Sequence, residues 1–139
     1  MANDRVTLIH EWFEQVWNRG DLSAVDRMMA PDSVHHGLHD DDGNEIRGRA
    51  AFIPFFHKFR EAFPDLHVVV EDVICEGDRM AARCRVYGTH GGHTLGFAAT
   101  NRPVEFTGMC WVRVENGKFV EGWNNFDFAT MSTQLLQPA

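Results

Sequence analysis

The sequence lacks the features that would place the chain in a membrane or on nucleic acid. No apolar run reaches the roughly 18 residues that cross a bilayer, and the first residues lead into an amphipathic segment rather than a signal sequence. Positive charge is scarce: 13 Lys and Arg stand against 20 Asp and Glu, and the basic residues are scattered. We therefore expect a cytoplasmic protein with no membrane or nucleic-acid partner.

Cysteine is scarce too, and it is not arranged for metal or redox chemistry. Cys75, Cys84 and Cys110 are odd in number, lie inside apolar stretches and show no CxxC spacing, so we expect reduced thiols in the core. The sequence has neither a P-loop nor a dinucleotide-binding fingerprint. These absences predict a protein without a cofactor and without a metal site.

The chain has the length and composition of one globular domain. It contains 139 residues, of which 44% are hydrophobic and 24% are charged. Both fractions are ordinary for a folded protein, and the length leaves little room for a second core. We expect a single domain over residues 1–139.

Helical periodicity dominates the first half of the sequence. Apolar residues recur at three- and four-residue spacings over 5–19, which predicts an amphipathic helix. Asp21 is a candidate N-cap for a second, short helix over 22–29. Five phenylalanines between 52 and 63 form a helical ridge that ends before Pro64. Three helices are therefore predicted.

The period changes to two after Asp65. Residues 66–75 and 79–87 predict one β-hairpin, and residues 104–115 and 118–127 predict a second across Asn116-Gly117. Residues 33–37 add a short extended piece, 90–102 form a Gly-rich excursion, and 128–136 predict a final helix. Helices followed by long antiparallel strands predict an α+β fold.

A series of short motifs covers nearly the whole chain in a characteristic order. They are Phe63-Pro64-Asp65-Leu66, Val70-Glu71-Asp72, Glu76-Gly77-Asp78-Arg79, Gly88-Thr89-His90, Arg102-Pro103-Val104-Glu105-Phe106, Asn116-Gly117-Lys118, and Glu121-Gly122-Trp123 through Asp127 to Gln134-Leu135. In this order and spacing the chain resembles the SnoaL-like polyketide cyclase (ester cyclase) family of the nuclear transport factor 2-like superfamily.

The resemblance implies a cone-shaped domain in which N-terminal helices close an apolar pocket over a curved antiparallel sheet. Characterised members of the family close a ring by intramolecular aldol condensation without metal or organic cofactor, using an Asp near the end of the last strand. Asp127 has that position here. Two departures, Phe97-Ala98-Ala99-Thr100-Asn101 in place of a Pro-Pro-Thr-Gly-like stretch and Gly122 where relatives often have His, predict an altered pocket mouth.

Asp127 has two interpretations. It follows an apolar stretch with Trp123 and Phe126, so burial could raise its pKa and make it a base. Alternatively, it caps the helix over 128–136. An Asp127 inside a cavity would favour catalysis, and one used as a cap would favour ligand binding alone.

The register of the second hairpin decides what faces Asp127. A two-residue Asn-Gly turn would pair Glu115 with Lys118 and put Arg113 on the opposite face. A three-residue loop with Gly117 in the left-handed region would shift the register by one and place Arg113 close to Glu121. The resemblance then puts Arg113 where cyclases have an assisting His. Arg113 could stabilise an enolate but could not act as a general acid.

The histidines favour hydrogen bonding over metal ligation. Strand alternation points only one of His35 and His36 inward, and the resemblance favours His36. Together with His39 they lack HxH or HExxH spacing. His90 and His93 lie in the Gly-rich excursion, where we expect them near the pocket mouth. The stretch from Asp40 to Asn44 is expected to be a solvated loop rather than a calcium site.

Two functions are consistent with these residues. The first is a cofactor-free enzyme in which Asp127 abstracts a carbon-bound proton from a small hydrophobic carbonyl compound and Arg113, His36 or Asn125 stabilises the enolate. The second is a non-catalytic binder of a small hydrophobic or aromatic ligand. The candidate substrate-binding residues, which include indoles that could stack on a ligand or pack in the core, are Trp12, Trp17, Trp111, Trp123, Asn125, Glu121 and His90.

Apolar residues on both faces of the long hairpins predict assembly. A monomer would expose one of these faces to water. We therefore expect a homodimer or a larger homo-oligomer that pairs through the outer face of the sheet. A protein that acts only through this face would instead fill its pocket with its own aromatic side chains.

Overall fold

The computed structural model describes residues 2–92 and 98–136, with side chains from residue 6 onward. Its helices are α1 (Ala2–Glu11), the π-helix η1 (Trp12–Asn18), α2 (Leu22–Met28), α3 (Arg49–Ala62) and α4 (Phe128–Leu136). Its strands are β1 (Met29–His39), β2 (Glu45–Arg47), β3 (His67–Glu76), β4 (Arg79–Thr89), β5 (Pro103–Glu115) and β6 (Lys118–Phe126). The predicted α+β class is confirmed.

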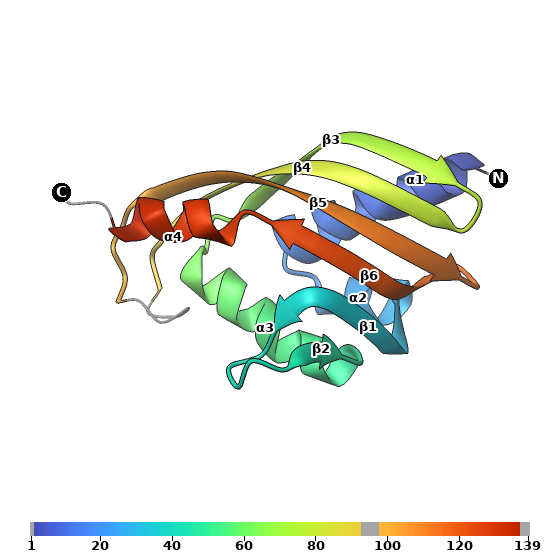
Figure 1. Ribbon diagram of the computed structural model, residues 1–139, viewed down its shortest axis with the longest axis horizontal. Coiled ribbons are helices and arrows are strands. Elements are labelled where there is room, and N and C mark those ends of the chain that lie inside the picture. Colours follow the sequence, from blue (N-terminus) through green and yellow to red (C-terminus); the bar gives the residue numbers. More distant parts are fainter. Residues whose placement is uncertain (1, 93–97, 137–139) are drawn as a thin grey trace.

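The strands form one curved sheet in the order β2-β1-β6-β5-β4-β3 (Figure 1). The expectation of a wholly antiparallel sheet is wrong at one pair, because β1 runs parallel to β6. These two strands are separated in sequence by β2, α3, the β3–β4 hairpin and β5, so no tight turn imposes opposite directions on them. The parallel pair joins β1 and β2, which come from the N-terminal third of the chain, to the rest of the sheet at β6.

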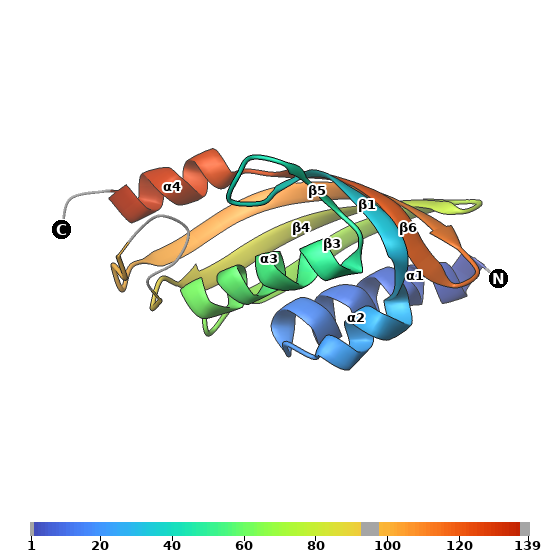
Figure 2. The same ribbon diagram turned by 90° about the horizontal axis from the view of Figure 1, so that it is seen from below.

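The helices and the sheet enclose the core between them. Figure 2 shows α1, α2 and α3 on one side of the curved sheet, which we call the inner side, and α4 continuing from β6 at one end. Along β5 the side chains alternate between buried and exposed over most of its length, with Val104, Phe106 and Cys110 in the core. The other side of the sheet, the outer face, is left without a covering helix among the described residues.

Most predicted elements are confirmed within a few residues. Asp21 caps α2 through a bond from the Ser23 amide to its carboxylate, 2.9 Å long. The helix before Pro64 ends at Ala62. The short strand β2 was not predicted, and the segment from Asp40 to Asn44 is the turn that joins it to β1.

The β5–β6 hairpin shows why the two candidate registers were hard to separate. Its turn is the two-residue Asn-Gly type, with positive φ at Asn116 and Gly117, and Glu115 pairs with Lys118. A bulge at Val120 then shifts the register, so that Arg113 pairs with Glu121. The predicted contact between Arg113 and Glu121 is confirmed, but the predicted three-residue loop is wrong.

Candidate binding cavity

A cavity of about 100 Å³ lies between the helices and the inner side of the sheet. One wall is aromatic and comes from η1 and α3, with Trp12, Trp17, Phe52 and Phe55. The opposite wall is formed by apolar side chains of β3 to β6. A concave, largely apolar space with few polar groups is the usual form of a site for a small organic molecule.

The π-helix places two indoles on this wall. A five-residue hydrogen bond, from the Arg19 amide to the Glu14 carbonyl at 3.0 Å, widens the helical turn. Both Trp12 and Trp17, which are five residues apart, therefore reach the cavity. The three- and four-residue spacing of the sequence predicted a regular α-helix, so this geometry was missed, although both tryptophans were predicted as ligand-binding residues.

His35 is the histidine that lines the cavity. Its side chain is buried, its Nε2 atom lies 2.9 Å from the hydroxyl of buried Ser33, and its ring centroid is 5.3 Å from that of Phe52. Burial, together with the neighbouring His36, lowers the pKa of His35 to about 4. The imidazole is therefore neutral at pH 7 and presents one donor and one acceptor.

The expectation that His36 faces the pocket is wrong. Alternation allowed only one of His35 and His36 to face inward, and the resemblance to the family favoured His36. Gly37 adopts a φ of 85° and interrupts the alternation, so Leu38 lies on the face of His35. A glycine before an apolar residue was the signal that could have revealed the switch.

Asn124 is the second polar residue at the cavity that sequence reasoning missed. Its side-chain amide donates to the His36 carbonyl oxygen at 3.2 Å. The parallel register pairs His35 with Gly122, so the imidazole stands beside a residue without a side chain. The bulge at Val120 shifts the alternation of β6, so that Asn124 lies on the inner face. No sequence pattern predicted this bulge.

Asp127 lies outside the cavity. Its carboxylate accepts a bond from the Thr130 amide at 3.0 Å and one from the Thr130 hydroxyl at 2.6 Å, so it caps α4. These bonds lower the pKa of Asp127 below its ordinary value. The expectation that burial would raise this pKa is wrong, because the side chain is exposed on the outer face.

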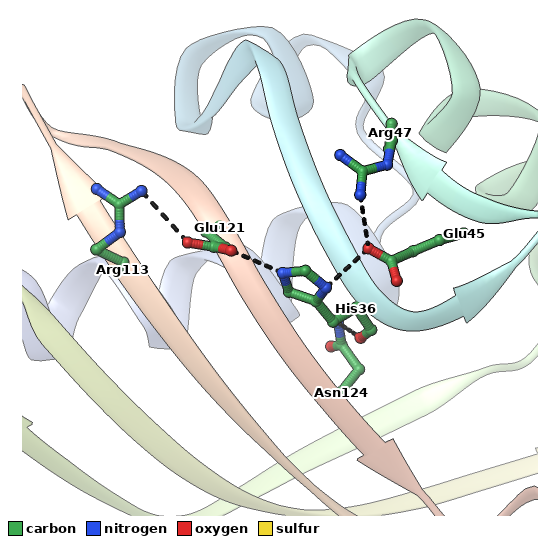
Figure 3. Close-up of polar contacts among 6 residues, drawn as sticks. All are labelled: His36, Glu45, Arg47, Arg113, Glu121 and Asn124. Atoms are coloured by element: carbon green, nitrogen blue, oxygen red, sulfur yellow. Dashed lines mark hydrogen bonds and ion pairs between the residues drawn. The ribbon is translucent and has the colours of Figure 1, made fainter.

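Arg113, Glu121 and His36 also meet on the outer face (Figure 3). The Glu121 carboxylate lies 2.7 Å from His36 Nε2 and 3.3 Å from an Arg113 nitrogen. The His36 hydrogen bond is the largest cause that lowers the pKa of Glu121. The other ring nitrogen of His36 lies 2.7 Å from Glu45, which Arg47 approaches in turn. Five charged or titratable residues thus cross four strands on the outer face, and among them Glu121 also borders the cavity.

The remaining predicted site residues are likewise separated from the cavity. Trp111, Trp123 and Asn125 lie exposed on the outer face. His90 is fully buried at the start of the excursion, where its Nδ1 atom accepts a bond from the Thr100 amide at 3.2 Å. It is not among the residues that line the cavity. His93 and Phe97 lie outside the described residues.

Among residues 2–92 and 98–136 no group of three His, Cys, Asp or Glu side chains is placed to hold a metal ion. No helix in the same ranges is long and apolar enough to cross a bilayer.

Solved structures share this architecture. A candidate SnoaL-like polyketide cyclase from Jannaschia sp. CCS1 superposes with a TM-score of 0.88 over 99% of this chain and 95% of its own at 24% identity, a likeness of fold. IdmH from Streptomyces antibioticus, a candidate polyketide cyclase, is 32% identical with a TM-score of 0.81, covering 94% of this chain and 96% of its own. AclR from Streptomyces galilaeus, a candidate hydroxylase, is 30% identical with a TM-score of 0.82, covering 97% and 82%.

The family itself follows from a match along nearly the whole sequence. A comparison with curated proteins found no significant match. The family model described as SnoaL-like polyketide cyclase matches residues 7–135, from the middle of α1 to the last turn of α4. The chain therefore belongs to the SnoaL-like polyketide cyclase family.

Proposed function

We propose that this protein binds a small, largely apolar carbonyl compound in the inner cavity without using Asp127 as a catalytic base. The observation that carries the proposal is the division of polar groups between the two sides of the sheet. The neutral side chains of His35 and Asn124 border the cavity, whereas the Asp127 carboxylate caps α4 on the outer face. An imidazole and an amide can bond a carbonyl oxygen of the ligand without carrying charge into an apolar site.

Proton abstraction requires a different geometry from the one observed. A general base must come within about 2.6–3.2 Å of the proton's carbon or reach it through one water. Glu121 borders the cavity, but its carboxylate is held by His36 and Arg113. The low pKa of both Asp127 and Glu121 makes each a weak base at pH 7.

Binding can be tested with the four tryptophan side chains as reporters. Acetophenone, titrated into ¹⁵N-labelled protein, should shift the indole N–H signals of Trp12 and Trp17 and leave those of Trp111 and Trp123 in place. His35→Phe should weaken this binding, and His57→Phe, a matched change at an exposed histidine of α3, should not. Shifts confined to Trp111 and Trp123 would contradict binding in the cavity.

The comparisons favour a second candidate function, cofactor-free aldol cyclisation or isomerisation of the same class of compound. Its support is the family match and the 32% identity to IdmH, which is described as a candidate cyclase. By this proposal Asp127 abstracts the proton, and Arg113, His36 or Asn125 stabilises the enolate, so the reaction takes place on the outer face of the sheet, where these side chains lie. Asp127→Asn would then lower turnover of an activated carbonyl substrate by at least about 10²-fold. Turnover within about twofold of wild type would remove Asp127 from the mechanism.

We also propose that two copies of the chain associate through the outer face. Paired positions on five neighbouring strands form a stripe across this face, made of Ile74, Ala81, Trp111, Trp123 and His36. Ile74 is 69% exposed and Trp111 is 47% exposed. An apolar stripe of this kind is typical of a protein contact.

The charges beside the stripe suit a second copy of the same chain. One neighbouring row pairs Glu76 with Arg79, Arg79 with Arg113, and Arg113 with Glu121. Because this row carries both signs, it can meet its own two-fold copy without net repulsion. Light scattering should give twice the mass of one chain, and Trp111→Glu should give a monomer. Tyr87→Glu, a matched change at another exposed aromatic residue, should remain a dimer.

A further inference from the structure

We infer that Trp17 sets an upper limit on ligand size and that the cavity selects compounds of a single ring over compounds of several fused rings. The inference rests on the proposed binding function and names the size class of the ligand. The residues concerned belong to η1 and α3 and form the aromatic wall on one side of the cavity.

The volume of the cavity is the first argument. It measures about 100 Å³, whereas an apolar cavity of about 150 Å³ is known to take up one benzene molecule. A single ring therefore enters after a small outward movement of the lining side chains. Two or three fused rings need a wall residue to leave its place, because a packed interior has no spare volume nearby.

Trp17 is the wall residue that lies among the phenylalanine rings of α3. Its ring centroid lies 5.5 Å from that of Phe56 and 5.8 Å from that of Phe52. Phe55 and Phe59 follow at 6.3 and 6.2 Å, both edge-on. The indole thus inserts between four rings of α3, and moving it breaks contacts with all of them.

The backbone around Trp17 is fixed from two sides. The Asn18 side chain forms a pair of bonds with β3, accepting from the Val68 amide at 2.6 Å and donating to the Val68 carbonyl at 3.0 Å. From α3, an Arg60 nitrogen donates to the Trp17 carbonyl at 3.1 Å. These bonds hold the last turn of η1 between β3 and α3, so the backbone at Trp17 cannot move away from the cavity without losing them.

The experiment uses ketones that differ in ring number. Cyclohexanone, acetophenone, 2-acetonaphthone and 2-acetylanthracene each carry one carbonyl, and the indole signals of Trp12 and Trp17 report their binding. In the wild-type protein the three-ring ketone should bind at least about tenfold more weakly than acetophenone. Trp17→Leu, which keeps an apolar side chain but frees the space of the indole, should bind the three-ring ketone at least about tenfold more tightly than wild type.

Trp111→Leu removes an indole from the outer face and should leave the ring preference of the wild type unchanged. If Trp17→Leu and Trp111→Leu show the same preference, the role of Trp17 is wrong. If wild type binds three rings as tightly as one, the size limit is wrong while the binding function stands. If no ketone shifts the Trp12 signal in any variant, the binding function itself fails.

Discussion

The two faces of the sheet use similar residues for different purposes. Trp12 and Trp17 close the inner cavity, where they contact phenylalanines, whereas Trp111 and Trp123 lie exposed on the outer face. The histidines divide in the same way. His35 is buried and neutral beside the cavity, and His36 lies between two carboxylates on the outer face.

This division shows that residue type does not assign function in this fold. A carboxylate, an arginine and a histidine do meet, but they meet on the outer face (Figure 3). The cavity side receives a histidine and an asparagine instead. Each face can be tested by variants that should affect one side of the sheet and leave the other unchanged.

The largest expected difference between the faces concerns packing. Phe52 is 1% exposed and contacts both cavity tryptophans. Phe52→Ala should lower the free energy of unfolding by about 3–5 kcal/mol, whereas Trp111→Ala, at a protein concentration low enough to keep the chain monomeric, should lower it by less than about 1 kcal/mol. Urea unfolding measures both. Equal losses would show that the outer face is packed as tightly as the core, and a Trp111→Ala loss that grows with protein concentration would reveal the homodimer.

The next effect is a pH dependence that comes from the inner face. The folded-state pKa of His35 is about 4, below its ordinary value of 6.5. Between these two values the unfolded chain binds a proton that the folded chain does not, so stability falls as the pH falls. The full contribution, about 3 kcal/mol, is present above pH 6.5 and is lost as the pH approaches 4.

Chemical unfolding at pH 7 and pH 5 tests this dependence. His35→Gln removes the titrating group and should flatten the change between these two values. His57→Gln, at an exposed position of α3, is the matched control and should keep the wild-type slope. The lowered pKa values of Asp127 and Glu121 affect folding stability only at lower pH, because both carboxyls lose their stabilising charge below about pH 4.5. If the stability of His35→Gln changes with pH as much as that of the wild type, another group is responsible for the effect.

A smaller effect distinguishes a helix cap from a catalytic group. Asn caps a helix about as well as Asp, and Ala does not. Asp127→Asn should therefore change the melting temperature by about a degree or less, while Asp127→Ala lowers it by a few degrees. Neither substitution should weaken binding of acetophenone in the cavity. A loss of ligand affinity in Asp127→Asn, with melting unchanged, would place the carboxylate in the ligand site.

The smallest effect belongs to the charged row on the outer face. The Glu121 side chain is 26% exposed, and its partners Arg113 and His36 are 34% and 28% exposed. Ion pairs at this exposure are screened by water and salt. Glu121→Gln should lower the melting temperature by less than about 2 °C, and 0.5 M salt should reduce the difference further. A larger loss would mean that the row is buried in the assembled protein.

The secondary structure could be predicted because local patterns reflect local physics. Asp21 and Pro64 stand at helix boundaries for steric and hydrogen-bonding reasons that act within a few residues. The long hairpins follow from period-two alternation and from the Asn116-Gly117 turn. The π-helix and the bulge at Val120 were missed, since each is one residue out of step with a regular pattern.

The sequence by itself determined the α+β class, the order of helices and hairpins, and membership in the SnoaL-like family. Only the tertiary structure decided which residues share a face. Gly37 switches the parity of β1, the bulge at Val120 switches that of β6, and the parallel pairing of these strands then puts His35 inside and His36 outside. Since strand side chains alternate with a period of two, a single irregular residue exchanges the cavity lining for the outer surface.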